Sequence, residues 1–408
     1  MRIANVIIVG LFMLISVGIH VRTWMDPAAA ASPKSLLPNI VNIYTPGANT
    51  FPSNHWVRLR IDTHELNASI QRKRGIRECR QMGNSLRVSI GYEMTWIFYE
   101  NRKTPVFLGI GDIPVARGLT PSNQDMATRV TRGMIKKNAT LLKDGWSMWV
   151  MPIPTRVSVY REWIRWPVMD ENMYERSPLN EDRTDELVDY IFSVLRESGV
   201  HFLDLRNVFR KTCAPVWDGT YVFPPGESHW SGRGIELAAS ELSEVLSRDG
   251  SVKLSTGKLL YKPIRWKCDF ASAFDLASWW PSKNNELLYF EDRIVVGRTP
   301  DPVSPSPSVL IVVAGTSYSG QYWASIPGVR GDFPFVVHLM INNAAVHNRS
   351  RAGRGSYESF GVFLSEKDAI SADFEKQYHC KPGSYRKIVI WEFPFRDLGT
   401  IMLGVDGG

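Results

Sequence analysis

The chain has 408 residues, of which 44% are hydrophobic and 11% aromatic, a composition that excludes a disordered protein and predicts a sizeable folded core. Its 48 lysine and arginine residues exceed its 41 aspartate and glutamate residues by little for this length, giving a net charge of +7. A charge this modest and dispersed argues against a nucleic-acid-binding protein, although it suits contact with an acidic partner such as an anionic polysaccharide.

The first segment of the chain predicts export. Between Arg2 and Arg22 the sequence is apolar, carries no Lys, Arg, Asp or Glu, and is just long enough to span a bilayer. A cleavable signal is the alternative, but the run from Ala28 to Ala31 lies well past the apolar core for a signal peptidase site. We therefore expect residues 1–25 to be an uncleaved anchor, or otherwise a signal, and the body to be exported.

Residues 26–85 follow as a tether and leading segment. Up to about Ser53 this region is rich in proline, alanine, serine and asparagine and has no sustained periodicity, which is typical of a linker. From residue 86 to about residue 400, strand-like and helix-like segments alternate, and we expect them to form one domain.

Three elements are predicted in the first half of that domain. Trp146 to Pro154 is an apolar run typical of a buried strand. Apolar residues then recur with helical spacing between Leu187 and Leu195, and Gly199 follows as a C-terminal stop. Residues 200–205 have the composition of a short strand.

The second half continues the alternation. Apolar residues between Ile235 and Leu246 have helical spacing, and Ser231 precedes them as an N-cap. Three β-branched apolar runs of strand length follow, at residues 309–313, 336–341 and 388–391. Strands that alternate with helices predict an α/β sandwich built on a mainly parallel sheet.

The four cysteines lie far apart, without metal-ligand spacing, at Cys79, Cys213, Cys268 and Cys380. In an oxidising compartment this number predicts two structural disulfides, with all three pairings open and buried free thiols as the alternative. We expect no metal ion and no other cofactor.

A first chemical motif, Glu227-Ser228-His229-Trp230, lies just ahead of the helix that follows Ser231. In an extended loop, residues two apart project to the same side, so the Glu227 carboxylate can orient the His229 imidazole. Asp218 is a competing carboxylate, and it ranks second because a Pro-Pro-Gly segment separates it from His229. A structural histidine is the alternative interpretation of the motif taken alone.

A second motif, Gly315-Thr316-Ser317-Tyr318-Ser319, follows the predicted strand that begins at Val309. Functional groups gather at the carboxyl ends of parallel strands, where Ser317 would emerge and nearby backbone N–H groups can stabilise an oxyanion. A hydroxyl becomes a nucleophile when a base takes its proton and a third group orients that base. Ser317, His229 and Glu227 supply those three groups, although small polar residues after a strand are also ordinary turn residues.

Together with Trp391-Glu392-Phe393-Pro394 and the nearby Arg396, the two motifs resemble those of the periplasmic alginate O-acetyltransferase family of the AlgJ/AlgX type. The resemblance covers residues 86–398 in order and spacing. It implies an SGNH-hydrolase-like three-layer α/β sandwich whose motif order is circularly permuted. It also assigns the nucleophile to Ser317, the base to His229 and the acidic role to Glu227, where the family pattern has aspartate.

The resemblance implies a function as well. An acetyl group, delivered across the membrane by a polytopic membrane acyltransferase partner, would be held on Ser317 and passed to a hydroxyl of an exported polysaccharide such as alginate or acetylated cellulose. The protein would act in the periplasm, anchored to the inner membrane by its N-terminal segment. The sequence after residue 398 has no room for the carbohydrate-binding module that follows in AlgX, so we expect the AlgJ-like arrangement.

Further candidates are polar or charged residues near the nucleophile and downstream of it, for substrate binding or an oxyanion hole: Thr316, Tyr318, Asn343, Arg354 and Arg396. The ancestry of the family implies glycine and asparagine donors, and position alone does not choose between Asn342 and Asn343 or between Gly353 and Gly355. Arginines 349, 351 and 354 are candidates for binding a uronate carboxylate, with a solvated loop as the alternative.

Two other functions stay open from the sequence. An exported carbohydrate acetyl esterase would form the same acyl-enzyme and differ only in whether water or sugar attacks it. A catalytically silent scaffold of a polysaccharide acetylation complex is the second, with Glu227 as a mark of a decayed site.

Overall fold

The computed structural model describes residues 92–99, 102–109, 112–164, 166, 168–169, 178–212, 221–224, 226–227, 229–268, 289–299, 307–320, 331–350, 356–399 and 401. The predicted anchor or signal at residues 1–25 and the tether at residues 26–85 lie outside these ranges. None of the helices in the described part of the chain is both long and apolar enough to cross a membrane.

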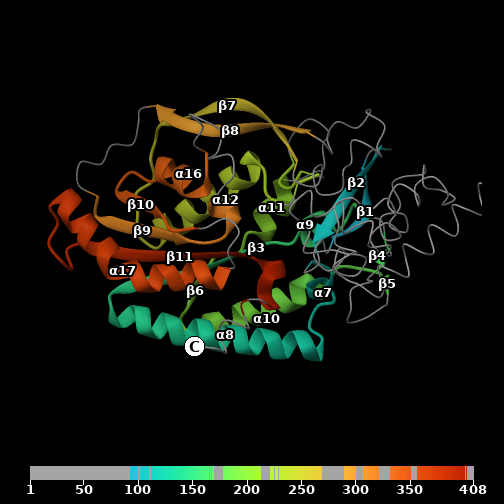
Figure 1. Cartoon of the computed structure of the whole chain (residues 1–408), viewed down its shortest axis with the longest axis horizontal. Helices are drawn as coiled ribbons and strands as arrows, with labels where there is room; N and C mark the ends of the chain where they lie inside the picture. The colour runs from blue at the N-terminus through green and yellow to red at the C-terminus, as the bar shows by residue number, and fades with distance from the viewer. Residues whose placement is uncertain are drawn as a thin grey trace, which may run out of the picture.

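A five-stranded sheet forms the centre of the molecule, in the order β10-β9-β11-β3-β6 (Figure 1). The strands are β10 (Ala344–Asn348), β9 (Val309–Ala314), β11 (Arg386–Pro394), β3 (Trp146–Ile153) and β6 (His201–Phe202). All neighbouring pairs are parallel. The three central strands are almost wholly buried, as parallel strands covered on both faces must be.

Helices cover both faces of this sheet (Figure 1). On one face lie α8 (Pro121–Lys143), α10 (Thr184–Glu197) and α17 (Ser356–Tyr378), and on the other lie α12 (Gly232–Arg248) and α16 (Phe333–Met340). Each layer has its own cluster of buried apolar side chains against the sheet. The predicted three-layer α/β sandwich with a parallel sheet is confirmed.

Shorter elements surround this sandwich. The helical ones are α7 (Asp112–Ala116), α9 (Arg156–Tyr160), α11 (Arg206–Thr212), α15 (Ser317–Gly320) and the 3-10 helix η3 (Phe395–Asp397). The remaining strands form antiparallel pairs: β1 (Tyr92–Tyr99) with β2 (Arg102–Gly109), β4 (Val168–Met169) with β5 (Pro178–Leu179), and β7 (Lys258–Lys267) with β8 (Tyr289–Thr299). The β7–β8 pair lies over α12 and α16 (Figure 1).

Two helices follow the sequence pattern closely. The helix predicted between Leu187 and Leu195 is α10, and Gly199, just past its end, has φ of 68°, a left-handed conformation that favours glycine. The helix predicted after Ser231 is α12, and the Ser231 hydroxyl accepts a hydrogen bond from the Gly234 N–H at 3.1 Å. The strand expected over residues 200–205 is confined to the two residues of β6.

The strand predicted at residues 336–341 is wrong, because this run lies mainly in helix α16. Asp332 caps the helix, accepting a hydrogen bond from the Phe335 N–H at 2.9 Å, and Pro334 occupies the first turn, where its missing N–H costs nothing. The β-branched residues Val336 and Val337 favour a strand locally, but the cap ahead of them starts a helix.

The expectation of two disulfides is also wrong. Cys380 is a free, half-buried thiol whose Sγ lies 3.6 Å from the Tyr378 carbonyl oxygen, so the four cysteines do not form two pairs. Cys268 is buried, and Cys79 and Cys213 lie outside the described residues.

The cap of α16 gives a test of the corrected assignment. We expect Asp332→Ala to lower the free energy of unfolding by about 1 kcal/mol, because the Phe335 N–H loses its acceptor. Asp332→Asn should keep most of the stability, since asparagine caps helices as well as aspartate does. Urea denaturation of both variants measures the difference, and equal stability of the two would contradict the capping role.

Candidate active site

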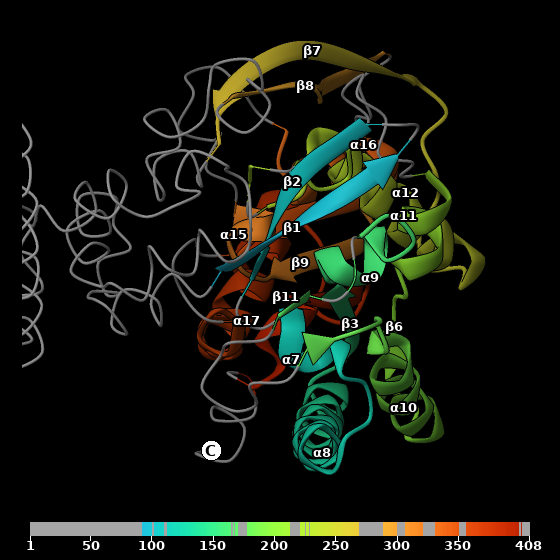
Figure 2. The ribbon, with the colours of Figure 1, turned by 90° about the vertical axis from the view of Figure 1, so that its right-hand side faces the viewer.

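The residues of the two motifs meet at the carboxyl edge of the sheet. β9 ends at Ala314, and the turn at Gly315 and Thr316 leads into α15, of which Ser317 is the first residue. His229 and Glu227 lie in the loop that precedes α12. Figure 2 faces this edge of the molecule, with α15 at the end of β9. The sheet therefore delivers the hydroxyl, and a loop distant in sequence delivers the imidazole and the carboxylate.

The three side chains form a continuous hydrogen-bonded series. His229 Nδ1 lies 2.8 Å from Glu227 Oε1, and His229 Nε2 lies 2.8 Å from Ser317 Oγ. Because a carboxylate only accepts, Nδ1 carries the proton and Nε2 is left to accept from the serine hydroxyl. Glu227 is fully buried and the His229 side chain is 14% exposed, so the carboxylate is shielded from solvent. This is the geometry that acyl transfer through a serine requires.

The main chain of Glu227 is held in place by hydrogen bonds. The Glu227 N–H donates to the Pro224 carbonyl at 3.1 Å, and the Glu227 carbonyl accepts from the buried Arg156 guanidinium of α9. Tyr160, also in α9, uses its hydroxyl to donate to the Phe223 carbonyl and to accept from the Phe223 N–H. Helix α9 thus supports the loop that carries the carboxylate, a role that no sequence motif indicated.

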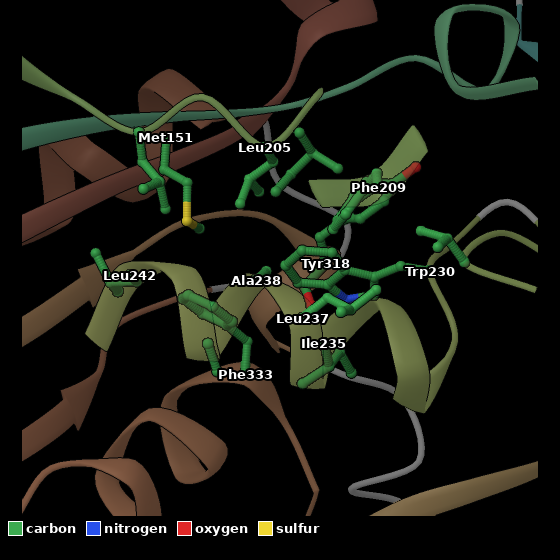
Figure 3. Packing of buried hydrophobic residues seen from close by; sticks show 14 of the residues in the cluster. Met151, Leu205, Phe209, Trp230, Ile235, Leu237, Ala238, Leu242, Tyr318 and Phe333 are labelled. Atoms are coloured by element: carbon green, nitrogen blue, oxygen red, sulfur yellow. The ribbon is translucent and has the colours of Figure 1, made fainter. Parts of the chain in front are cut away.

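A second contact joins the two motifs. Trp230 is fully buried and its indole N–H donates to the Tyr318 carbonyl oxygen at 2.8 Å. The Tyr318 ring lies edge-on to the Trp230 ring, with centroids 5.7 Å apart, and 5.2 Å from the His229 ring centroid. Figure 3 shows Trp230 and Tyr318 side by side in the apolar cluster that includes Phe333. Adjacent residues of the loop therefore bind adjacent residues of the turn.

A buried carboxylate from β11 lies under the nucleophile turn. Glu392 is fully buried, its Oε2 accepts from the Thr316 N–H at 2.9 Å, and its Oε1 accepts from the Thr316 hydroxyl at 2.8 Å. Burial raises the pKa of Glu392 to about 7, against the hydrogen bonds from Ser319 and Thr316 that favour the ionised form. A Cβ atom on Gly315 would come within 2.2 Å of Oε2, so only glycine fits beside this carboxylate.

Three further sequence candidates lie at two different edges of the sheet: Thr316 and Tyr318 at the carboxyl edge, and Asn343 at the amino edge. Thr316 already bonds Glu392 through its N–H and hydroxyl, and the Tyr318 side chain is buried beside His229, so neither side chain is an oxyanion donor. Asn343 is wrong as an oxyanion donor, because it bonds Ser308 and Lys253 at the amino ends of β9 and β10, the opposite edge of the sheet from Ser317.

Arg354 and Arg351 lie outside the described residues, as do Gly353 and Gly355. Arg349 is described and pairs with Glu366 of α17 at 3.1 Å.

Asn348 is a polar residue at this edge that the sequence reasoning missed. It ends β10, its side-chain amide donates to the Ser319 carbonyl at 3.3 Å, and its side-chain oxygen accepts from the Ser350 N–H at 2.8 Å. The signal available was the strand at residues 344–348, whose carboxyl end must lie beside that of β9.

Arg396 does lie at the candidate site. It follows β11 in η3, its side chain is 20% exposed, and its guanidinium carbon lies 5.7 Å from the centroid of the Tyr318 ring. Arg396, Tyr318 and Arg156 line a small cavity at the carboxyl ends of β3 and β11. In the described part of the chain, no cluster of histidine, cysteine, aspartate or glutamate side chains is arranged to hold a metal ion.

Comparison with known protein families gives a match over more than half of the chain. Residues 116–395 match the family described as SGNH hydrolase-like domain, acetyltransferase AlgX. Among solved structures, the chain is similar to the O-acetyltransferase domain of Pseudomonas putida AlgJ, at 20% identity and a TM-score of 0.47, covering 74% of this chain and 97% of that one. For Pseudomonas aeruginosa AlgX the values are 17% and 0.44, covering 73% of this chain and 63% of that one. Comparison with curated proteins finds no match.

The buried carboxyl groups near the site predict how stability depends on pH. Burial raises the pKa of Glu392 to about 7, and that of Asp292, which accepts from the Gly232 N–H at the start of α12, to about 6. The folded chain holds both protons more tightly than the unfolded chain. The resulting stability is therefore fully present below the ordinary pKa values, 4.5 for glutamate and 3.8 for aspartate, and is lost as pH rises through the folded-state values.

We expect the free energy of unfolding to fall between about pH 4 and about pH 7, and Glu392→Gln to remove at most about 3 kcal/mol of that fall. Urea denaturation at several pH values measures it. A Glu392→Gln variant with the full wild-type pH dependence would contradict the assignment.

Proposed function

Because this chain belongs to the AlgX family of SGNH hydrolase-like acetyltransferases, and so is an O-acetyltransferase of that type, we propose that Ser317, His229 and Glu227 are its catalytic triad. The observation that carries the proposal is the hydrogen-bonded order of carboxylate, imidazole and hydroxyl, at 2.8 Å for each contact, between residues from two distant segments. The family supports polysaccharide O-acetylation, and we assign the acceptor to an exported polysaccharide.

In the first half-reaction, Ser317 Oγ attacks the carbonyl carbon of an acetyl donor while His229 Nε2 takes the hydroxyl proton. Glu227 holds the imidazole in the required tautomer and stabilises the imidazolium. We assign oxyanion stabilisation to the backbone N–H of Ser317, since the first N–H groups of a helix have no partner inside it and the neighbouring Thr316 N–H is bound to Glu392. The donor's leaving group departs with the proton from His229.

In the second half-reaction, His229 removes a proton from a sugar hydroxyl, whose oxygen attacks the acetyl-serine carbon. The Ser317 Oγ–C bond breaks, and Oγ takes the proton back from His229. Attack by water would make the protein an esterase, so the two activities share every group described here and differ in the acceptor that the site admits.

The donor and the location complete the proposal. A polytopic membrane acyltransferase would supply the acetyl group from the cytoplasmic side, and the protein would work in the periplasm, held at the inner membrane by residues 1–25. The motivation is the apolar stretch between Arg2 and Arg22, which is long enough to span a bilayer.

An acetyl-serine intermediate gives the direct test. We expect incubation of the full chain with 4-nitrophenyl acetate to add one acetyl group to Ser317, because the ester needs only the nucleophile and its base. Ser317→Ala should form no adduct, while Ser350→Ala, which removes another hydroxyl from the same edge of the sheet, should react like the wild type. Intact-protein mass spectrometry measures the adduct. Equal labelling of Ser317→Ala and wild type would exclude this nucleophile.

The acceptor class is tested through Arg396. A guanidinium binds a carboxylate in a paired geometry, so we expect Arg396→Gln to lower kcat/KM about 10-fold for an oligouronate acceptor and to leave a neutral cello-oligosaccharide within about 2-fold. Arg386→Gln is the matched control, because Arg386 lies in β11 at the amino end of the sheet. Transfer is followed by mass spectrometry of the acetylated oligosaccharide. Equal losses on both acceptors, or none, would contradict a uronate-binding role.

A further inference from the structure

Several hydrogen bonds of the nucleophile turn meet at Thr316, the residue before Ser317. Its N–H and hydroxyl both donate to Glu392, its hydroxyl oxygen accepts from the Tyr318 N–H at 3.3 Å, and its carbonyl oxygen accepts from the Ser319 N–H at 3.2 Å. Thr316 therefore precedes Ser317 and also bonds the two residues that follow it, Tyr318 and Ser319. A contact that fixes the position of Thr316 therefore also fixes the position of Ser317.

Glu392 has the shape this task needs. A carboxylate presents two acceptor oxygens in one plane, and here each oxygen takes one donor of the same threonine. β11 pairs with β9 up to Trp391 and Ala314, so Glu392 is the next residue along and lies beside the turn as the strand ends. Gly315 leaves the space that the carboxylate fills. A side chain of another shape would leave the Thr316 N–H buried without an acceptor.

These bonds involve none of the reacting atoms. The hydrogen bond between His229 and Ser317 uses the hydroxyl proton, which is absent once Ser317 carries an acetyl group. The two Glu392 bonds remain through both half-reactions. They also survive a change of protonation, because a protonated Glu392 can donate to the Thr316 hydroxyl oxygen while it still accepts from the N–H.

We infer that Glu392 is a positioning residue for the transfer reaction, whose two hydrogen bonds to Thr316 keep Ser317 aligned with His229 before and after the acetyl group is attached. The inference rests on the proposed role of Ser317 as nucleophile. Glu392 itself touches neither the hydroxyl nor the imidazole through any contact that the described residues show. Misalignment of a nucleophile by about 1 Å costs about 100-fold in rate, which sets the expected effect.

The experiment compares variants of the full chain reacting with 4-nitrophenyl acetate. We expect Glu392→Ala to slow acetylation at saturating ester about 100-fold, with the half-saturating ester concentration changed less than about 3-fold, because alignment rather than binding is lost. Glu392→Gln should stay within about 5-fold of wild type, since the amide oxygen accepts from the N–H and the amide nitrogen donates to the hydroxyl oxygen. Thr316→Val should lose about 10-fold, because it keeps one of the two bonds.

Asp182 gives a matched control. Its buried carboxylate likewise accepts from the N–H and hydroxyl of a single threonine, Thr184, at the start of α10 and away from the nucleophile turn. Asp182→Ala should acetylate at the wild-type rate. The inference is overturned if Glu392→Ala or Thr316→Val reacts like wild type, or if Glu392→Gln is as slow as Glu392→Ala.

Hydrogen–deuterium exchange of the peptide covering residues 309–320 provides a readout that does not depend on activity. We expect faster exchange around Thr316 in Glu392→Ala and unchanged exchange in Glu392→Gln and Asp182→Ala. If wild type forms no adduct while exchange responds to Glu392→Ala, the proposed nucleophile is wrong and the hold on the turn is right. If wild type forms the adduct and neither rate nor exchange responds to Glu392→Ala, the positioning role alone is wrong.

Discussion

The candidate site depends on one clasp, in which two adjacent side chains of a loop bind two adjacent residues of a turn. His229 reaches the Ser317 hydroxyl and Trp230 reaches the Tyr318 carbonyl, each across 88 residues of sequence. The sheet positions the turn, and the N-terminus of α12 positions the loop, where Ser231 bonds the Val222 carbonyl and the Gly234 N–H. A hydrogen bond between flexible loops would be weak. Here regular structure and the buried indole fix both the loop and the turn, so the distances between His229 and Ser317 are kept.

Buried carboxyl groups surround this clasp, and they differ in what they hold. Glu227 orients the imidazole, while Glu392 holds a threonine next to the hydroxyl. Removing a carboxylate from water is unfavourable, and the raised pKa of Glu392 expresses that penalty. An apolar residue in its place would avoid this desolvation penalty but would provide no acceptor for the Thr316 N–H. Glu392 therefore lowers stability at the edge of the sheet where the proposed nucleophile is aligned, a trade-off that is usual at catalytic sites.

The sequence predicted the layered fold well, because long amphipathic helices such as α10 and α12 and continuous apolar strands such as β3 and β9 carry strong periodic signals. It failed at α16, which is too short and too uniformly apolar for the period to separate helix from strand. The motifs predicted that Ser317, His229 and Glu227 lie together, and hydrogen bonds join these three side chains. Asn343, taken from the asparagine donor that the resemblance implies, lies at the opposite edge of the sheet. The contact between Glu392 and Thr316 could not be foreseen, since it arises from pairing of β9 with β11 across 76 residues.

The position of β11 in the sheet determines when the candidate site can form as the chain is synthesised and folds. β3 and β6 are made early, β9 and β10 late, and β11, the last strand of the described chain, lies between the two groups. Before it inserts, the early and late halves of the sheet share no edge, the turn after β9 lacks the carboxylate beneath it, and the histidine loop has no aligned hydroxyl to meet. A nascent chain therefore carries the proposed catalytic groups before the sheet that aligns them is complete.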